Sequence, residues 1–280
     1  MIESIDTYSD MVELLNSPKF SLSAWERYAR SLSDELPAKC MKDAASYDFE
    51  RQVLPVIERV KGNPALDQLH DAVQQISREI SPLFAQRGLR EPKARLILYL
   101  GLCNGAGWAT QLEGRDVVLL GAEKILELGW QDKRKLSSLI HHELGHLWHK
   151  QYGRFENPKT QEERSVLQLF QEGAAMYIEQ LLGGDARYYI QDKNGWLEWC
   201  EQHQAGIKKE YLSRLYSGES TQDFFGDWRR FQGYSDVGYY LGTIFFRFLL
   251  FTYSLPEAAG LDYPHVRQEF LRFAENAEAV

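Results

Sequence analysis

The segment SSLIHHELGHLWHK, residues 137–150, contains the pattern His-Glu-x-x-His at positions 142 to 146. In a helix, residues four apart lie on one face, so the imidazoles of His142 and His146 can reach the same ion. Glu143 follows the first histidine and points to one side of that ion, where a bound water would lie. The pattern therefore predicts a metal centre with two histidine ligands and Glu143 as a base.

Local signals place this pattern on one long helix. Asp132 is a suitable N-cap, and Tyr152 followed by Gly153 is a suitable end. The pattern is too short to define a site by itself, because catalytic zinc takes three protein ligands and leaves one position for water.

The third ligand is not supplied by the same helix. An extended pattern with a further histidine ligand would need glycine at 149 and histidine at 152, where this chain has His149 and Tyr152. His149 itself is poorly placed to close a tetrahedron with His142 and His146, so we expect it beside the ligands or at the surface. The remaining option is a carboxylate on the following helix.

Glu172 fits that option, 172 − 146 = 26 residues after the second histidine. We expect its helix to begin at Thr160, where Thr160-x-x-Glu163 forms a capping box, and to end at Gly183-Gly184. Apolar neighbours turn Glu172 inward, where a divalent cation would offset the cost of burying a carboxylate. Small residues at 173–175 would let the two helices approach closely. The rival carboxylates lie in a loop or first turn, where solvation or capping explains them: Glu156, Glu162 and Glu163.

The rest of the chain predicts an α+β fold that is predominantly helical. Residues 95–100 and 117–120 are short apolar runs typical of strands, separated by the small-residue segment 104–110. Residues 1–90 are expected to form an N-terminal helical layer, and 239–253 a buried core helix. We therefore expect an N-terminal helical region, 1–90, and a catalytic region, 91–280, which could form one continuous domain.

Composition narrows the class of protein. A formal charge of −8 and the lack of a Lys/Arg cluster argue against a nucleic-acid partner. The segment 239–253 is too short for a membrane span and contains Arg247, so no span is expected. Three scattered cysteines are typical of reduced thiols, and the N-terminus lacks the features of a signal peptide, which together favour a cytoplasmic location.

Two further segments carry a resemblance to a known family. Glu172-Gly-Ala-Ala-Met-Tyr-Ile-Glu179 is similar to the Glu-Gly-x-x-x-Tyr-x-Glu stretch of gluzincin metallopeptidases, and the segment from Gly238 to Gly242 is similar to their Tyr-x-x-Gly. Residues 95–250 resemble most closely a bacterial family of predicted zinc-dependent proteases that is catalogued as a domain of unknown function. The resemblance implies a thermolysin-like core: a small sheet with an edge strand, the His-Glu-x-x-His helix and the glutamate helix.

The resemblance also assigns roles. It implies Zn²⁺ held by His142, His146 and Glu172. Glu179 would orient one zinc-bound histidine. Tyr239 would donate a hydrogen bond to the oxyanion, with Tyr240 or Tyr234 as alternatives. An edge strand at 104–110 would pair with the substrate backbone. The residues that would let a peptide approach that strand are Gly105, Ala106 and Gly107.

These features predict zinc-dependent hydrolysis of peptide bonds in a peptide or protein substrate. The aminopeptidases of the family carry a glutamate in the edge strand that binds a free amine. Residues 104–110 contain no acid, which favours an endopeptidase or oligopeptidase. Two alternatives stay open: a catalytically silent zinc-binding regulatory or scaffold protein, and a zinc hydrolase of a non-peptide amide. A simple binding module in which the motif is accidental is the third and weakest.

Overall fold

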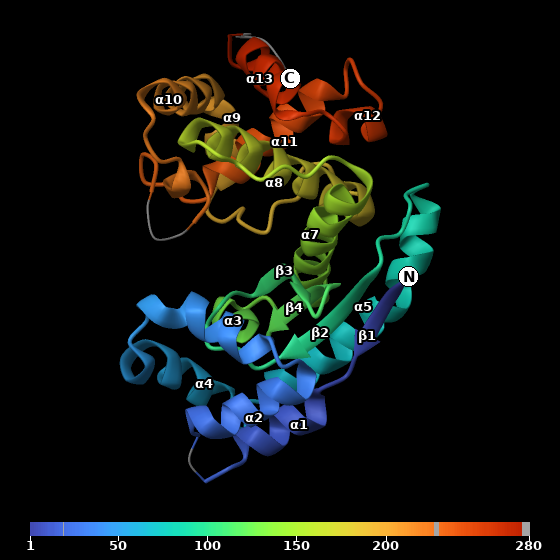
Figure 1. Cartoon of the computed structure of the whole chain (residues 1–280), viewed down its shortest axis with the longest axis vertical. Coiled ribbons are helices and arrows are strands. Elements are labelled where there is room, and N and C mark those ends of the chain that lie inside the picture. The colour runs from blue at the N-terminus through green and yellow to red at the C-terminus, as the bar shows by residue number, and fades with distance from the viewer. Residues whose placement is uncertain (19, 227–229, 276–280) are drawn as a thin grey trace. The chain divides into compact units, whose positions relative to one another are not determined.

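The computed structural model describes residues 1–18, 20–226 and 230–275, and the chain divides into two compact units, 1–144 and 145–280. The elements appear in Figure 1. In the first unit they are β1 (Ile2–Ile5), α1 (Tyr8–Leu15), α2 (Leu22–Leu32), α3 (Leu36–Asp43), the short helices Ala44–Ser46 and Phe49–Val53, α4 (Leu54–Val60), α5 (Ala65–Gln86), β2 (Ala94–Tyr99), β3 (Gly107–Leu112), β4 (Arg115–Gly121) and α6 (Ala122–Leu128). Helix α7 (Lys133–Tyr152) contains the boundary, and α8 (Gln161–Gly183), α9 (Trp196–Gln202), α10 (Gln204–Ser217), the turn Gln222–Phe224, α11 (Val237–Leu249), α12 (Leu255–Ala259) and α13 (Tyr263–Glu275) follow.

The sheet of the first unit is mixed, with the strand order β1-β2-β4-β3. β1, β2 and β4 are parallel, and β3 runs antiparallel to β4. β2 reads ARLILY and is buried along almost its whole length, as a central strand covered on both faces should be. The expected strands at 95–100 and 117–120 are therefore present, and the α+β, mainly helical class is confirmed.

β3 and β4 form a tight hairpin that makes β3 an edge strand. The two turn residues, Glu113 and Gly114, both have positive φ, +51° and +73°, which suits a two-residue turn whose twist matches the strands. The expected strand at 104–110 is shifted, because the strand begins at Gly107. Gly105 and Ala106 belong to the preceding loop instead, where the Ala106 carbonyl accepts a hydrogen bond from Gly121 N–H at 3.0 Å.

Residues 1–90 are mainly helical, as expected, except at their start. Residues 2–5 form β1, which pairs with β2 from Ile2↔Ala94 to Ile5↔Ile97. Helix α5 packs against both of these strands. The first 90 residues are thus continuous with the sheet and belong to the first unit, 1–144.

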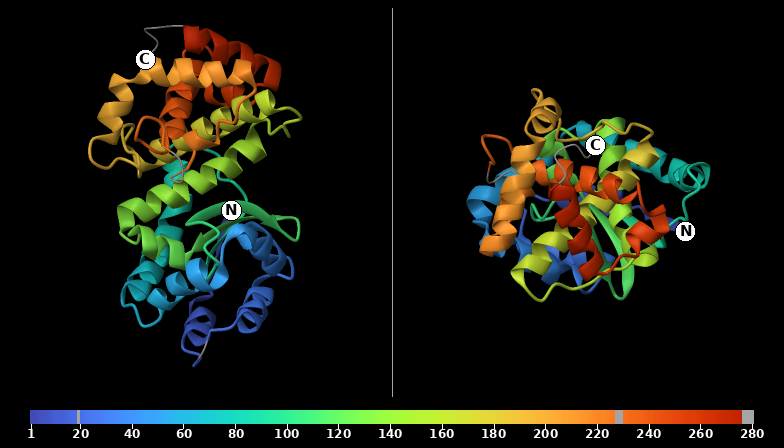
Figure 2. Two further views of the ribbon diagram at one scale, coloured as in Figure 1. Left: turned by 90° about the vertical axis from the view of Figure 1, so that its left-hand side faces the viewer. Right: turned by 90° about the horizontal axis from the view of Figure 1, so that it is seen from above.

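The regular elements described in the second unit are helices (Figure 2), and the most extensive contact among them is between α8 and α11. The core of this unit is aromatic, with Phe245 of α11 packed edge-on against Phe270 of α13 at 5.4 Å between ring centroids. Arg247 is accommodated in the apolar α11 because it donates hydrogen bonds to Gln180 Oε1 and the Ala186 carbonyl, both at 2.6 Å. The helix ends at Leu249, four residues before the expected end.

Two negative expectations can be compared with the structure. Among the described residues, no helix is long and apolar enough to cross a membrane. All three cysteines are free thiols: Cys40, Cys103 and Cys200.

Candidate metal centre

Helix α7 places His142 and His146 one turn apart. Its start is capped as predicted: Asp132 Oδ1 accepts the N–H of Lys135 at 3.1 Å. It ends at Tyr152, also as predicted. The two imidazoles therefore share one face of a continuous helix.

Helix α8 supplies Glu172. Thr160 Oγ1 accepts the N–H of Glu163 at 3.1 Å, and Gly184 ends the helix with φ +72°. Only half of the expected capping box forms, because the Glu163 carboxylate bonds the N–H of Lys159 and not that of Thr160. The Glu172 side chain is 18% exposed and its Oε2 lies 3.4 Å from Nε2 of His146.

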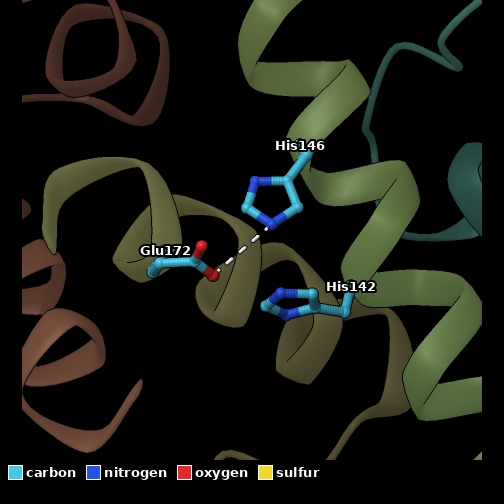
Figure 3. A group of neighbouring side chains, drawn as sticks. All are labelled: His142, His146 and Glu172. Atoms are coloured by element: carbon cyan, nitrogen blue, oxygen red, sulfur yellow. Dashed lines mark ion pairs between the residues drawn. The ribbon is translucent and has the colours of Figure 1, made fainter. Parts of the chain in front are cut away.

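These three side chains point toward one another (Figure 3). One ligand atom each from His142, His146 and Glu172 lies within 4.8 Å of the others. Over the described ranges, this is the only group of three or more His, Cys, Asp or Glu side chains gathered so closely.

The donor set fits a zinc ion. Two imidazole nitrogens and one carboxylate oxygen are a ligand combination of catalytic zinc, with bonds of about 2.0 to 2.2 Å. Two such ligands at a tetrahedral angle lie about 3.4 Å apart. The distance between His146 Nε2 and Glu172 Oε2 is the same, 3.4 Å, which is compatible with a shared ion.

Small residues allow the close approach of the glutamate helix, as the sequence predicts. A Cβ on Gly145 would lie 2.8 Å from the carbonyl oxygen of Ala175, so α8 and the C-terminal end of α7 meet backbone to backbone. On the other side of α8, a Cβ on Gly173 would overlap the carbonyl of Gly242 in α11. Glu172 therefore lies on a helix that packs closely against two others, at Gly173 against α11 and at Ala175 against α7.

Glu143 is buried, 8% exposed, and contacts the edge strand. Its Oε2 accepts the backbone N–H of Ala109 at 2.7 Å. The absence of a side chain at Gly107 makes this possible, because a Cβ there would lie 2.6 Å from Glu143 Oε1. Of the predicted substrate-binding residues, only Gly107 thus touches a predicted catalytic residue, while Gly105 and Ala106 contact the end of β4.

Glu179 lies on the same helix as Glu172, and Tyr239 lies on α11, which packs against that helix. Glu179, two turns further along α8, is 3% exposed. It is therefore buried and is not a solvated acid on the helix surface. Tyr239 is half-buried in the first turn of α11, with its ring edge-on to Phe225 at 5.7 Å. Their roles toward a metal or substrate stay predictions.

The alternatives to Tyr239 are engaged elsewhere. The hydroxyl of Tyr240 is hydrogen-bonded to Gln204 Oε1 at 3.0 Å within the core. Tyr234 stacks on Trp199 with 4.2 Å between ring centroids. Tyr239 has contacts of its own as well, so the role of each of the three stays a prediction.

His149 is neither at the surface nor placed to bind a metal. It is 1% exposed, its ring is edge-on to Phe170, and its Nε2 lies 3.2 Å from the Ala259 carbonyl. Burial lowers the pKa of His149 to about 4, so the ring is neutral and donates to that carbonyl. This hydrogen bond joins α7 to Ala259, the last residue of α12.

Sequence reasoning missed Glu123, a fully buried acid at the start of α6. Burial raises the pKa of its carboxyl to about 7, although backbone N–H groups from Gly101 and Cys103 oppose the rise. The available signal was an acid placed directly after the buried strand β4.

Comparison of the chain with models of known protein families, with curated proteins and with solved structures finds no match.

Proposed function

We propose that this chain is a zinc-dependent hydrolase that cleaves peptide bonds. One observation carries the proposal: His142, His146 and Glu172 gather one ligand atom each within 4.8 Å, and the residue after His142 is a glutamate. A purely structural zinc site has four protein ligands and no use for a base. Three ligands with an adjacent carboxylate are the set that hydrolysis requires.

The chemistry is divided between the ion and the chain. A zinc ion bound by these ligands would polarise the scissile carbonyl and lower the pKa of a coordinated water to ~7. Glu143 then accepts the proton of the attacking water and delivers it to the departing nitrogen. Tyr239 donates a hydrogen bond from its hydroxyl to the developing oxyanion.

Substrate binding is assigned to the outer edge of β3. Because the Ala109 N–H points to Glu143 and not to β4, the Ala109 carbonyl also faces away from β4. An extended peptide would pair there, next to the base. Farther along the same edge, the Gln111 carbonyl is taken by Lys39 Nζ at 2.6 Å, which limits the length of the pairing.

An internal peptide bond is the favoured target. Neither β3 nor the loop before it contains an acid to bind a free amine, since residues 104–112 read NGAGWATQL. Acetylating the N-terminus of a substrate peptide should therefore leave its cleavage rate unchanged. A rate that depends on the free amine would instead assign the chain to the aminopeptidases.

The first test is metal content. Wild type and Glu143→Gln should contain near-stoichiometric zinc by mass spectrometry, and Glu172→Ala should not. Glu156→Ala is a matched control, because Glu156 is paired with Arg154 and should not bind metal. Equal trace metal in all four proteins would remove the proposal.

The second test is cleavage of a mixture of unstructured peptides, followed by mass spectrometry of the fragments. Wild type should cut and Glu143→Gln should not, at equal zinc. Zinc without cleavage would favour the silent zinc protein, and cleavage of simple amides alone would favour the non-peptide hydrolase.

A further inference from the structure

The buried carboxyl of Glu123 holds the loop that leads into β3. Gly101 donates its N–H to Glu123 Oε2 at 2.9 Å, and Cys103 donates its N–H to Oε1 at 3.1 Å. Both donors belong to the loop, while Glu123 is the second residue of α6. A buried acid without such partners would be strongly destabilising, so these two contacts fix the loop against the helix.

The surroundings of Glu123 offer it little other compensation. The groups that face it are phenols and thiols, and burial raises the pKa of Cys40 and of Cys103 to about 12 and that of Tyr99 well above its ordinary value. These groups are therefore neutral near pH 7. Lys124, its neighbour in the helix, is the nearby cation and favours the ionised form weakly. The N–H groups of Gly101 and Cys103, together with that of Glu123 itself, are thus the main polar partners of the carboxyl.

The loop packs closely against its surroundings at two glycines. A Cβ on Gly101 would lie 2.6 Å from Glu123 Oε1, and a Cβ on Gly121 would overlap the carbonyl of Gly105. Cys103 has φ +63°, a conformation that is costly for a residue with a side chain. Its N–H bond to Glu123 offsets part of that cost.

The same loop continues directly into β3, the strand whose Ala109 N–H bonds the Glu143 carboxylate. Ala106 is tied to β4 through its hydrogen bond from Gly121, and Gly107 begins β3. Two residues later, the Ala109 N–H bonds Glu143 Oε2 at 2.7 Å. Every contact in this series lies within the first unit.

We infer that Glu123 is a positioning residue that fixes the loop 101–106 and, through it, the register of β3 and the carboxylate of Glu143. The inference rests on the proposed function only where it treats Glu143 as the base.

Hydrogen exchange at individual amides, followed by NMR on the full chain, tests the positioning directly. In Glu123→Gln, one N–H of the loop faces the amide NH₂ and loses its acceptor. Exchange should then accelerate about tenfold or more at Gly101, Cys103 and Ala109, because local opening becomes easier, but not at Leu96 in β2. Glu127→Gln is the matched control on the same helix, since Glu127 is exposed and pairs with Arg59 and Lys124.

A second variant removes the other anchor of the loop without changing a buried charge. Asn104 donates its side-chain amide to the Cys40 carbonyl at 2.9 Å, so Asn104→Ala should also accelerate exchange at Ala109. Unchanged exchange at Ala109 in a folded Glu123→Gln and in Asn104→Ala would overturn the inference.

Activity supplies an independent readout. At unchanged zinc content, Glu123→Gln should lower kcat about tenfold or more, because Glu143 is no longer held in place. Loss of zinc in step with activity would reveal a merely structural role and overturn the inference. If wild type cleaves no peptide, the proposed function fails, and exchange at Ala109 still decides whether Glu123 positions Glu143.

Discussion

Ala109 and Glu143 are joined by a hydrogen bond of 2.7 Å, from the backbone N–H of an edge strand to the carboxylate of a helix that also carries His142 and His146. An edge strand presents unpaired N–H groups that can recruit another chain. Here one of them is used to fix a side chain. The strand that is proposed to bind substrate is therefore the same strand that orients the proposed base.

Gly107 is required for that arrangement. In Gly107→Ala, the new Cβ would lie 2.8 Å from both Glu143 Cγ and Leu139 Cδ1, besides its closer approach to Oε1. We expect kcat to fall about a hundredfold with zinc content unchanged, because a carboxylate displaced by roughly 1 Å loses its alignment. Steady-state kinetics beside metal analysis measures this. Full activity in the variant would show that Gly107 is not required to position Glu143.

Gly173 should be indispensable to the packing of α8 on α11. A Cβ there would overlap the Gly242 carbonyl, so Gly173→Ala should cost about 1 to 3 kcal/mol of unfolding free energy. Gly206→Ala is the control: Gly206 lies in α10 with no atom within 4 Å of an added Cβ, and the change should stabilise by about 0.5 to 1 kcal/mol. Urea unfolding of both variants decides this, and equal effects would contradict the tight crossing.

The helices of the site were predictable because their signals are local. The caps Asp132 and Thr160 and the terminal glycine at 184 lie next to the ends that they define. The spacing of His142 and His146 is fixed by the helix itself. Small residues beside Glu172 indicated a close approach of two helices, although not that Gly173 would face α11 while Ala175 faces α7.

The remaining features depend on contacts between residues distant in the sequence. β1 has four residues, of which only two are apolar, so the sequence shows no periodicity that would predict a strand there. Its partner β2 is about 90 residues away. His149 is neutral and buried because the Ala259 carbonyl, 110 residues further along, accepts its hydrogen bond. Glu123 is recognisable only once the loop at 101–103 is seen to fold onto it.

Zinc should stabilise the chain through Glu172. Free zinc at one hundred times its dissociation constant would raise the unfolding free energy by ~3 kcal/mol if it binds only the folded chain. Chelator should remove this gain from wild type and from Glu143→Gln, and leave Glu172→Ala unaffected. Thermal unfolding with and without chelator measures it. A chelator effect of equal size in Glu172→Ala would assign the metal to other ligands.

His149 should make the stability of the metal-free chain depend on pH. Its pKa is lowered by burial to about 4 from an ordinary 6.5, so between these values the unfolded chain binds a proton that the folded chain does not. Stability contributed by the neutral ring is therefore complete above pH 6.5 and is lost as the pH falls toward 4, by ~2 kcal/mol between pH 7.5 and 5. The variant His149→Gln should not show this part of the pH dependence.

The control for this effect is His265→Gln. His265 is 62% exposed and pairs with Asp262 at the surface, so its replacement should remove much less of the pH dependence than His149→Gln does. Burial lowers the pKa of His141 to about 4 as well, so His149→Gln should keep part of the slope. Urea unfolding at pH 5 and 7.5, in chelator to exclude metal release, gives both differences. If the pH dependence of unfolding in His149→Gln equals that of wild type, water reaches the His149 ring and α7 does not pack tightly against Ala259.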